Sequence, residues 1–433
     1  NTAIGSYAMY DNTTGDYNTA VGQSALYNNE TADNNTAVGY VALNANTTGC
    51  QNTAVGVSGL QRNTTGNFNT VVGDFSLEDN TTGGCNVVLG GVALCQNTTG
   101  GRNIAIGRAT LRNNTTACDN TAVGFQSMLC NQTGANNTAV GVCSLHCNTA
   151  SNNTGVGFNS LLKNISGTEN TSLGAHALED NTTADENVAV GFKSLFTNTT
   201  GAQNTAVGLC ALASNTTAGY NTAVGSLALN ANTTGTGLTG VGHIALIKNT
   251  TGDKNTAIGY DTLGENTTAD NNTAVGYFAL RVNTTGADNT AVGYLSLLDN
   301  TTGLGLVAVG CGALTNNTTA NYNVAVGGNG LRDNTTGTQN VAVGTSALAF
   351  NTTAGCNTAL GHSALEVATT GSCNTAVGRT ALLALTTGTR NTGVGKGALC
   401  DITTTQDNTG IGYDAARDST ANYTTAVGSE AVF

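Results

Sequence analysis

The chain has 433 residues, of which 58 are Gly and none is Pro or Trp, and only 9% are charged. Globular domains average about 25% charged residues, so this composition argues against an ordinary enzyme domain. The net charge of −12 removes the electrostatic basis for binding nucleic acid or an acidic bilayer, and no stretch approaches the roughly 18 apolar residues of a membrane span.

A short repeat organises the whole sequence. The segment Asn1 to Gly5 recurs at Asn18 to Gly22 and onward to Thr424 to Gly428, giving 26 starts. The step is 17 residues, except from 137 to 153 and from 408 to 424, where it is 16. A fixed period without linkers is typical of a solenoid. We therefore expect residues 1–433 to form a single uncapped solenoid domain, and the in-phase start without Met suggests a processed or partial product of a longer precursor.

Each repeat, or coil, is numbered here from position 1 to position 17, with the consensus N-T-A-V-G-x-x-A-L-x-x-N-T-T-G-x-x. The β-branched residues at positions 2 and 4 and the small residues at positions 3 and 5 predict a strand over positions 2 to 5. A second short strand is expected over positions 7 to 10, around Leu26 or Leu43. Position 5, always Gly, and positions 12 to 15 are the predicted turns. The predicted fold is all-β: a parallel β-solenoid, or β-roll, of about 26 coils of 17 residues.

Two arrangements of the interior are open at this point. In the first, position 4 meets position 9 across a thin core and the Ala/Gly face looks outward. In the second, small residues at positions 3 and 8 line a very narrow interior and the aliphatic row faces a neighbouring chain. We favour the first, because an exposed row of Val, Ile and Leu would be larger than monomers tolerate.

The segment Asn18 to Leu26, with Asn-Thr-Ala-Val-Gly followed by Ala-Leu, resembles the NTAVG-type repeats of phage-like fibres and surface-exposed proteins. It is also similar to the β-roll head repeats of trimeric autotransporter adhesins. The resemblance spans the whole chain, although the 17-residue period is longer than the adhesin repeat. It implies a left-handed coil and an extracellular fibre or adhesive stalk rather than a chemistry.

Position 12 reads Asn-x-Ser/Thr in 20 of the 25 complete repeats, a pattern that N-glycosylation requires. Stacked Asn ladders and turn chemistry explain the same pattern without glycans, so both interpretations stay open. Further acceptors outside this row include Asn34, Asn136, Asn271 and Asn422. The candidate residues of the row are Asn12, Asn29, Asn46, Asn63, Asn80, Asn97, Asn114, Asn131, Asn164, Asn181, Asn198, Asn215, Asn232, Asn249, Asn266, Asn283, Asn300, Asn317, Asn334 and Asn351.

In repeats 22 to 25 the row is lost, which an inward corner or a contact zone between subunits would allow; the residues there are Ala368, Leu385, Ile402 and Ser419. The 12 cysteines show no CxxC pair and no nearby pair of histidines, so we expect no metal site. Two pairs occupy the same position of adjacent coils, which predicts two disulfide rungs and an oxidising compartment, with free thiols as the alternative. These pairs are Cys130 with Cys147 and Cys356 with Cys373.

No catalytic or cofactor-binding residues are expected. The four histidines lie in different coils, and the carboxylates beside the position-12 turn lack the spacing of a calcium repeat. We therefore expect no enzyme and no cofactor. The histidines are His146, His176, His243 and His362.

The predicted function is a structural subunit of an extracellular or cell-surface filament. Its expected partners are further copies of the chain, stacked head to tail, and glycans, with no nucleic acid and no membrane span. The head-to-tail prediction rests on the open β edges of the first coil and of the partial coil that ends at Phe433. An adhesin or phage-type fibre shaft whose receptor-binding tip lies outside this chain is the alternative, and an ice-binding solenoid is the weakest option.

Overall fold

A computed structural model describes residues 1–431. They form no helix, and so none long and apolar enough to cross a membrane. The chain divides into two compact units, Asn1–Gly219 and Tyr220–Phe433. Both units repeat the same coil of about 17 residues, which confirms the all-β solenoid. The hand of the coil and the treatment of residues 1–433 as one domain stay predictions.

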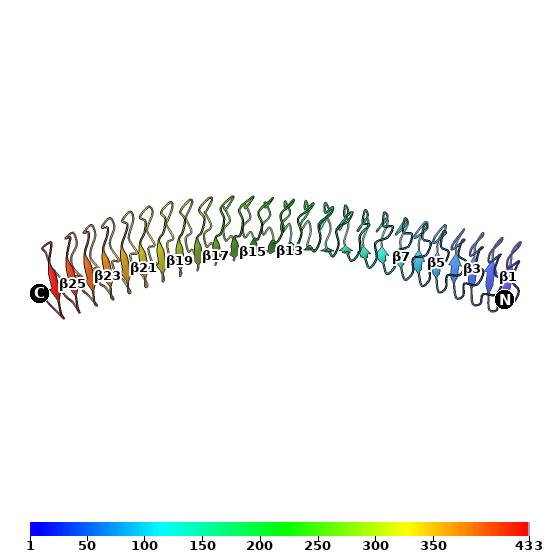
Figure 1. Ribbon diagram of the computed structural model, residues 1–433, viewed down its shortest axis with the longest axis horizontal. Coiled ribbons are helices and arrows are strands. Elements are labelled where there is room, and N and C mark those ends of the chain that lie inside the picture. Colours follow the sequence, from blue (N-terminus) through cyan, green and yellow to red (C-terminus); the bar gives the residue numbers. More distant parts are fainter. Residues whose placement is uncertain (432–433) are drawn as a thin grey trace. The chain divides into compact units, whose positions relative to one another are not determined.

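Each coil contributes one three-residue strand at positions 2 to 4, and neighbouring strands pair in parallel (Figure 1). The first unit contains β1 (Thr2–Ile4), β2 (Thr19–Val21), β3 (Thr36–Val38), β4 (Thr53–Val55), β5 (Thr70–Val72), β6 (Val87–Leu89), β7 (Ile104–Ile106), β8 (Thr121–Val123), β9 (Thr138–Val140), β10 (Thr154–Val156), β11 (Thr171–Leu173), β12 (Val188–Val190) and β13 (Thr205–Val207). The second unit contains β14 (Thr222–Val224), β15 (Thr239–Val241), β16 (Thr256–Ile258), β17 (Thr273–Val275), β18 (Thr290–Val292), β19 (Val307–Val309), β20 (Val324–Val326), β21 (Val341–Val343), β22 (Thr358–Leu360), β23 (Thr375–Val377), β24 (Thr392–Val394), β25 (Thr409–Ile411) and β26 (Thr425–Val427).

The register places like positions beside each other. Thr19 pairs with Thr36, which is 17 residues later. The two shorter steps keep this alignment, because Thr138 pairs with Thr154 and Thr409 pairs with Thr425. The missing residue is therefore absorbed in the turn after position 12 and not in the strand.

The expected second strand at positions 7 to 10 is wrong. These residues form a turn in which positions 7 and 9 have left-handed backbones, with φ values of 57° at Ser24 and 52° at Leu26. The Leu26 N–H still reaches the next coil, donating to the Ala42 carbonyl at 3.0 Å. The left-handed conformation costs about 1–2 kcal/mol per residue, and complete burial of the leucine, worth about 1.5–3 kcal/mol, offsets it.

The interior contains the small face of the strand, which is the arrangement that we did not favour. Ala37 at position 3 is fully buried, whereas Thr36 and Val38 on either side are only half-buried. The cause is the leucine at position 9: a Cβ placed on Gly240, at position 3, would lie 3.1 Å from Leu229 Cγ. The leucine row thus leaves space for little more than a methyl group opposite the sheet.

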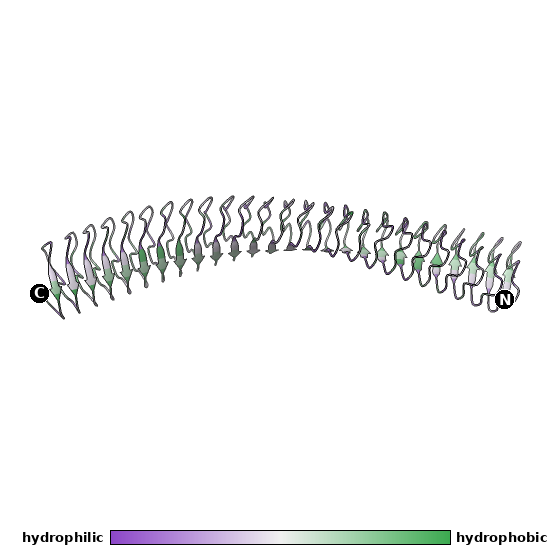
Figure 2. Ribbon diagram, viewed as in Figure 1, coloured by the Kyte–Doolittle hydropathy of each residue, from purple (hydrophilic) through white to green (hydrophobic). Residues whose placement is uncertain are grey.

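The outward face of the strands has two compositions. Most strands present Thr at position 2 and Val, Ile or Leu at position 4. Six strands instead present aliphatic residues at both positions, and in Figure 2 two groups of them are strongly green, β6 with β7 and β19 to β21. The sixth is β12 (Val188–Val190). These strands form the apolar part of the outward face.

Candidate functional site

The asparagines at position 12 form a buried hydrogen-bonded ladder. Asn46 Nδ2 donates to Asn29 Oδ1 of the preceding coil at 2.9 Å and to the Gly49 carbonyl at 2.8 Å. A second ladder runs along position 1, where the Asn35 backbone N–H donates to Asn18 Oδ1 at 2.9 Å. Asn35 Nδ2 also donates to the Gly49 carbonyl, at 2.9 Å. The coil of Asn35 and Asn46 therefore closes on one carbonyl that accepts from both ladders.

This burial bears directly on the predicted glycosylation row. Of its twenty candidates, Asn12 is half-buried and all the others are buried. Attaching a sugar to Nδ2 would remove a ladder donor and would require space that the interior lacks. Burial therefore argues against glycosylation of this row in the folded chain. The acceptors outside the row, Asn34, Asn136, Asn271 and Asn422, are all exposed.

Where the position-12 row is lost, the replacing side chains are still inside. Ala368 and Leu385 are fully buried and Ile402 is 2% exposed, while Ser419 is half-buried. These apolar side chains therefore occupy the same buried position as the hydrogen-bonded amides that they replace. The row therefore marks an inward corner, and the expected contact zone between subunits is not supported.

The ladder is interrupted at the short coil that begins at Asn137. Asn148 Nδ2 donates to the Ala150 carbonyl at 2.7 Å. Asn131 Oδ1, one coil earlier, is among the few buried side-chain atoms without a partner in the described part of the chain. Asn351 Oδ1 is another, because Ala368 follows it in the row. The one-residue deletion in the coil thus shifts the Asn148 amide away from its expected acceptor.

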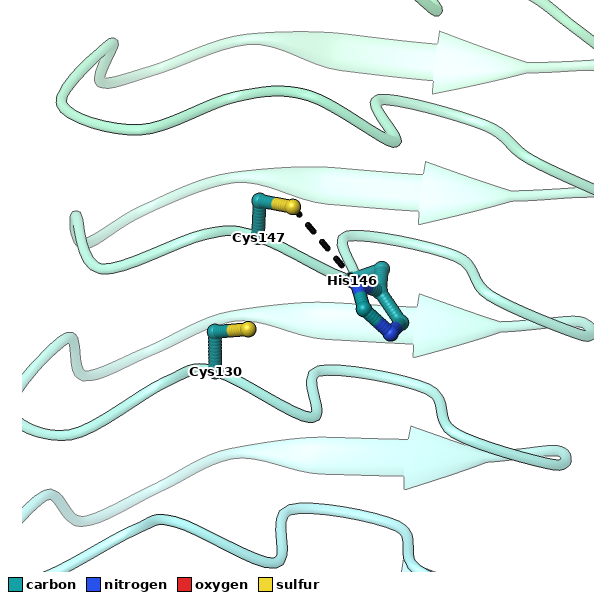
Figure 3. A group of neighbouring side chains, drawn as sticks. All are labelled: Cys130, His146 and Cys147. Atoms are coloured by element: carbon teal, nitrogen blue, oxygen red, sulfur yellow. Dashed lines mark hydrogen bonds between the residues drawn. The ribbon is translucent and has the colours of Figure 1, made fainter.

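Neither predicted disulfide is formed, and Cys130, Cys147, Cys356 and Cys373 are free thiols. Stacking in register places the Cys130 and Cys147 side chains side by side instead of turning one toward the other (Figure 3). Their sulfur atoms lie within 4.8 Å of each other, whereas a disulfide requires about 2.05 Å.

The same region brings together three possible metal ligands, although the sequence predicted no metal site. The Cys130, Cys147 and His146 ligand atoms all lie within 4.8 Å of one another, and all three residues are half-buried (Figure 3). His146 Nδ1 lies 3.5 Å from Cys147 Sγ. Sequence reasoning missed this group because it compared cysteines only at equal positions. His146 is at position 10 and Cys130 at position 11 of the preceding coil, so neighbouring positions would have revealed it.

Burial sets the protonation of this group. It raises the pKa of the Cys147 thiol, and the adjacent Cys130 thiol raises that pKa further. Burial also lowers the pKa of His146 below its usual value of 6.5. Near neutral pH the group therefore holds a protonated Cys147 thiol and a neutral imidazole, which is the form of histidine that binds metals.

Two of the other histidines belong to aromatic clusters. The His176 ring packs edge-on against Phe158 and Phe192. The His243 ring stacks on Tyr260, which begins a stack of tyrosines at position 6 that continues with Tyr277 and Tyr294. The signal for this stack was present in the sequence as aromatic residues 17 apart. The tyrosine rings remain about half exposed, with fractions of 43% at Tyr260, 45% at Tyr277 and 53% at Tyr294.

Comparison with protein-family models finds no match for the chain. Comparison with curated proteins likewise finds no match.

Proposed function

We propose that the chain is a structural subunit of an extracellular filament, in which copies stack head to tail. The observation that carries the proposal is that one hydrogen-bonding pattern repeats from coil to coil. The N–H groups of Thr19 and Leu26 donate to the following coil, while those of Gly22 and Ser24 donate to the preceding coil. Because the two sides of a coil are complementary, one copy can continue the stack of another.

The use of the interior supports a structural role. Its amides form ladders and its alanines and leucines form apolar rows, so neighbouring coils contribute to each other's stability. The proposal includes no enzymatic activity and no nucleic-acid partner, consistent with the net charge of −12. If the chain carries glycans, we assign them to the exposed acceptors, such as Asn34 and Asn271.

A charge placed on the open edge of the first coil tests head-to-tail stacking. Ala3 is exposed in this coil, whereas the equivalent residue of the next coil, Ala20, is fully buried. Ala3→Lys therefore leaves the isolated chain intact, but a second copy cannot cover the charge. Electron microscopy and light scattering over a range of concentrations should show filaments of the unchanged chain and only short particles of the variant.

Ile4→Lys is the matched control. Ile4 is 60% exposed and follows Ala3 on the opposite, outward face of the strand, so this charge does not block the edge. We expect Ile4→Lys to form filaments like the unchanged chain. Single particles of the unchanged chain at all concentrations, or equal behaviour of the two variants, would overturn head-to-tail stacking.

A further inference from the structure

We propose that Cys130, His146 and Cys147 bind one zinc ion. The site lies on the two consecutive coils that begin at Asn120 and Asn137 (Figure 3). Two sulfur ligands and an imidazole form one of the ligand sets that Zn²⁺ prefers, with the fourth position open to water. The inference is independent of filament formation, because all three ligands belong to one chain.

The distances fit a tetrahedral ion. Zinc bonds of about 2.3 Å to sulfur and about 2.0–2.1 Å to nitrogen place two neighbouring ligand atoms about 3.6 Å apart. His146 Nδ1 and Cys147 Sγ are 3.5 Å apart. Cys130 Sγ is within 4.8 Å of Cys147 Sγ and of a ring nitrogen of His146, so a rotation of the Cys130 side chain would complete the set.

The backbone holds the ligands in place. The Cys130 N–H donates to the His146 carbonyl at 2.9 Å, which links the two coils at the site. The Cys147 N–H donates to the Leu162 carbonyl of the following coil at 3.1 Å. Both cysteines are thus fixed before any ion arrives, which reduces the entropic cost of binding.

The surrounding charges are compatible with a cation that binds two thiolates. Lys163 is the next residue in the row of Cys130 and Cys147, and its Nζ lies 2.7 Å from an oxygen of Asp180. Its positive charge lowers the pKa of the Cys147 thiol, although burial has the larger, opposite effect. The ion pair with Asp180 holds the ammonium group of Lys163 beside the site.

Zinc binding has a defined proton balance. The two thiols lose one proton each to solvent as the two S–Zn bonds form, whereas the neutral imidazole binds through its ring nitrogen without losing a proton. Affinity should therefore rise with pH until both thiols ionise readily in the presence of the ion. No oxidant or reductant takes part.

The other stacked pair of cysteines separates the contribution of the histidine to zinc binding from that of two stacked thiols. Cys356 and Cys373 also share one position of adjacent coils, but they are exposed. Among the described residues, the group of Cys130, His146 and Cys147 is the one set of three or more that meets the distance requirement. The Cys356 and Cys373 pair therefore serves as a control for the effect of two stacked thiols alone.

The test titrates the reduced full chain with Zn²⁺ against a chromophoric chelator, and with Co²⁺ to record sulfur-to-cobalt charge-transfer absorption. We expect one tight site per chain. Cys147→Ser and His146→Asn should weaken Zn²⁺ binding at least about tenfold and remove or shift the cobalt spectrum. Cys356→Ser should change neither. Circular dichroism checks that each variant keeps the fold.

Two outcomes would overturn the proposal. Unchanged Zn²⁺ affinity in both Cys147→Ser and His146→Asn would show that these residues are not ligands. An equal loss in Cys356→Ser would show that the signal comes from thiols in general. Before the titration, a separate sample of the protein is alkylated and analysed by mass spectrometry. Alkylation of Cys130 and Cys147 shows that both are thiols, so that a disulfide between them does not mimic a negative result.

Discussion

Gly56 shows why position 5 is glycine in every repeat. Its φ is +140°, and a Cβ there would lie less than 3.0 Å from the carbonyl oxygen of Gly73 in the next coil. The backbone conformation and the close approach of the neighbouring coil both exclude a side chain. The glycine ends the strand and allows the chain to turn while the coils remain one strand spacing apart.

Gly56→Ala and Gly59→Ala form a matched pair within one coil. Gly56→Ala should destabilise the chain by about 1–3 kcal/mol from backbone strain alone. A Cβ on Gly59 would lie 3.6 Å from its nearest neighbour, the Gly56 carbonyl oxygen, which is an ordinary van der Waals contact. Most coils hold Ala at this position, so Gly59→Ala should stabilise by about 0.4–1 kcal/mol. Guanidinium unfolding measures both, and changes of the same sign would contradict the assignment.

The asparagine ladders follow a different rule. Leu238 and Leu306 occupy position 1, and Leu385 occupies position 12, all of them buried like the asparagines they replace. Positions 1 and 12 therefore accept either an amide with satisfied hydrogen bonds or an apolar side chain. In the position-12 row an amide followed by an apolar residue loses one partner, as Asn351 Oδ1 does beside Ala368. In the position-1 row the partner is kept, because the backbone N–H of Leu238 still donates to Asn221 Oδ1 at 2.9 Å.

At the scale of the strand, alternate residues divide the coil into an inner and an outer surface. In β17, Ala274 is fully buried and Val275 is half-buried. The sequence tolerates Leu on the outer surface, at Leu89 and Leu173, but on the inner surface it has nothing larger than Val, as at Val88. Size is thus limited on one face only.

A leucine introduced on the inner or on the outer face of β17 should have unequal consequences. Ala274→Leu forces a branched side chain against the leucine row and should cost about 1–3 kcal/mol by overpacking. Val275→Leu enlarges a half-exposed side chain and should change the free energy of unfolding by less than about 0.5 kcal/mol. Denaturant unfolding of the two variants gives the comparison. A larger loss for Val275→Leu would place the aliphatic row inside, as we first favoured.

At the scale of the whole molecule, the coil is the unit that can be removed. Within each unit an inner strand pairs with the strands of the coils on either side, as β17 does with β16 and β18. Stability in such an array is approximately a sum of coil terms and terms between neighbouring coils. The number of coils can therefore change without altering the contacts that remain.

Deleting residues 272–288 removes one complete 17-residue coil and joins two segments in phase. We expect this variant to keep the circular dichroism of the unchanged chain and nearly the same guanidinium midpoint. Deleting residues 272–279 removes only part of the coil. The remaining residues of that coil then no longer lie beside the equivalent positions of the neighbouring coils. This variant should unfold earlier and be cleaved by proteases near the junction. Equal stability of the two deletions would contradict the stacking register.

The sequence alone determined the period, the stacking of residues 17 apart and a strand that begins at position 2, which was predicted to end at position 5 and ends at position 4. Identical residues recur at that interval, and only in-register stacking pairs them along the parallel strands. Tertiary structure decided which face is inside, because the left-handed turns aim each leucine at the sheet and leave space only for small side chains, mostly Ala and none larger than Val. It also decided the burial of the asparagine row and the meeting of Cys130 with His146 and Cys147, since both depend on how one coil turns over the next.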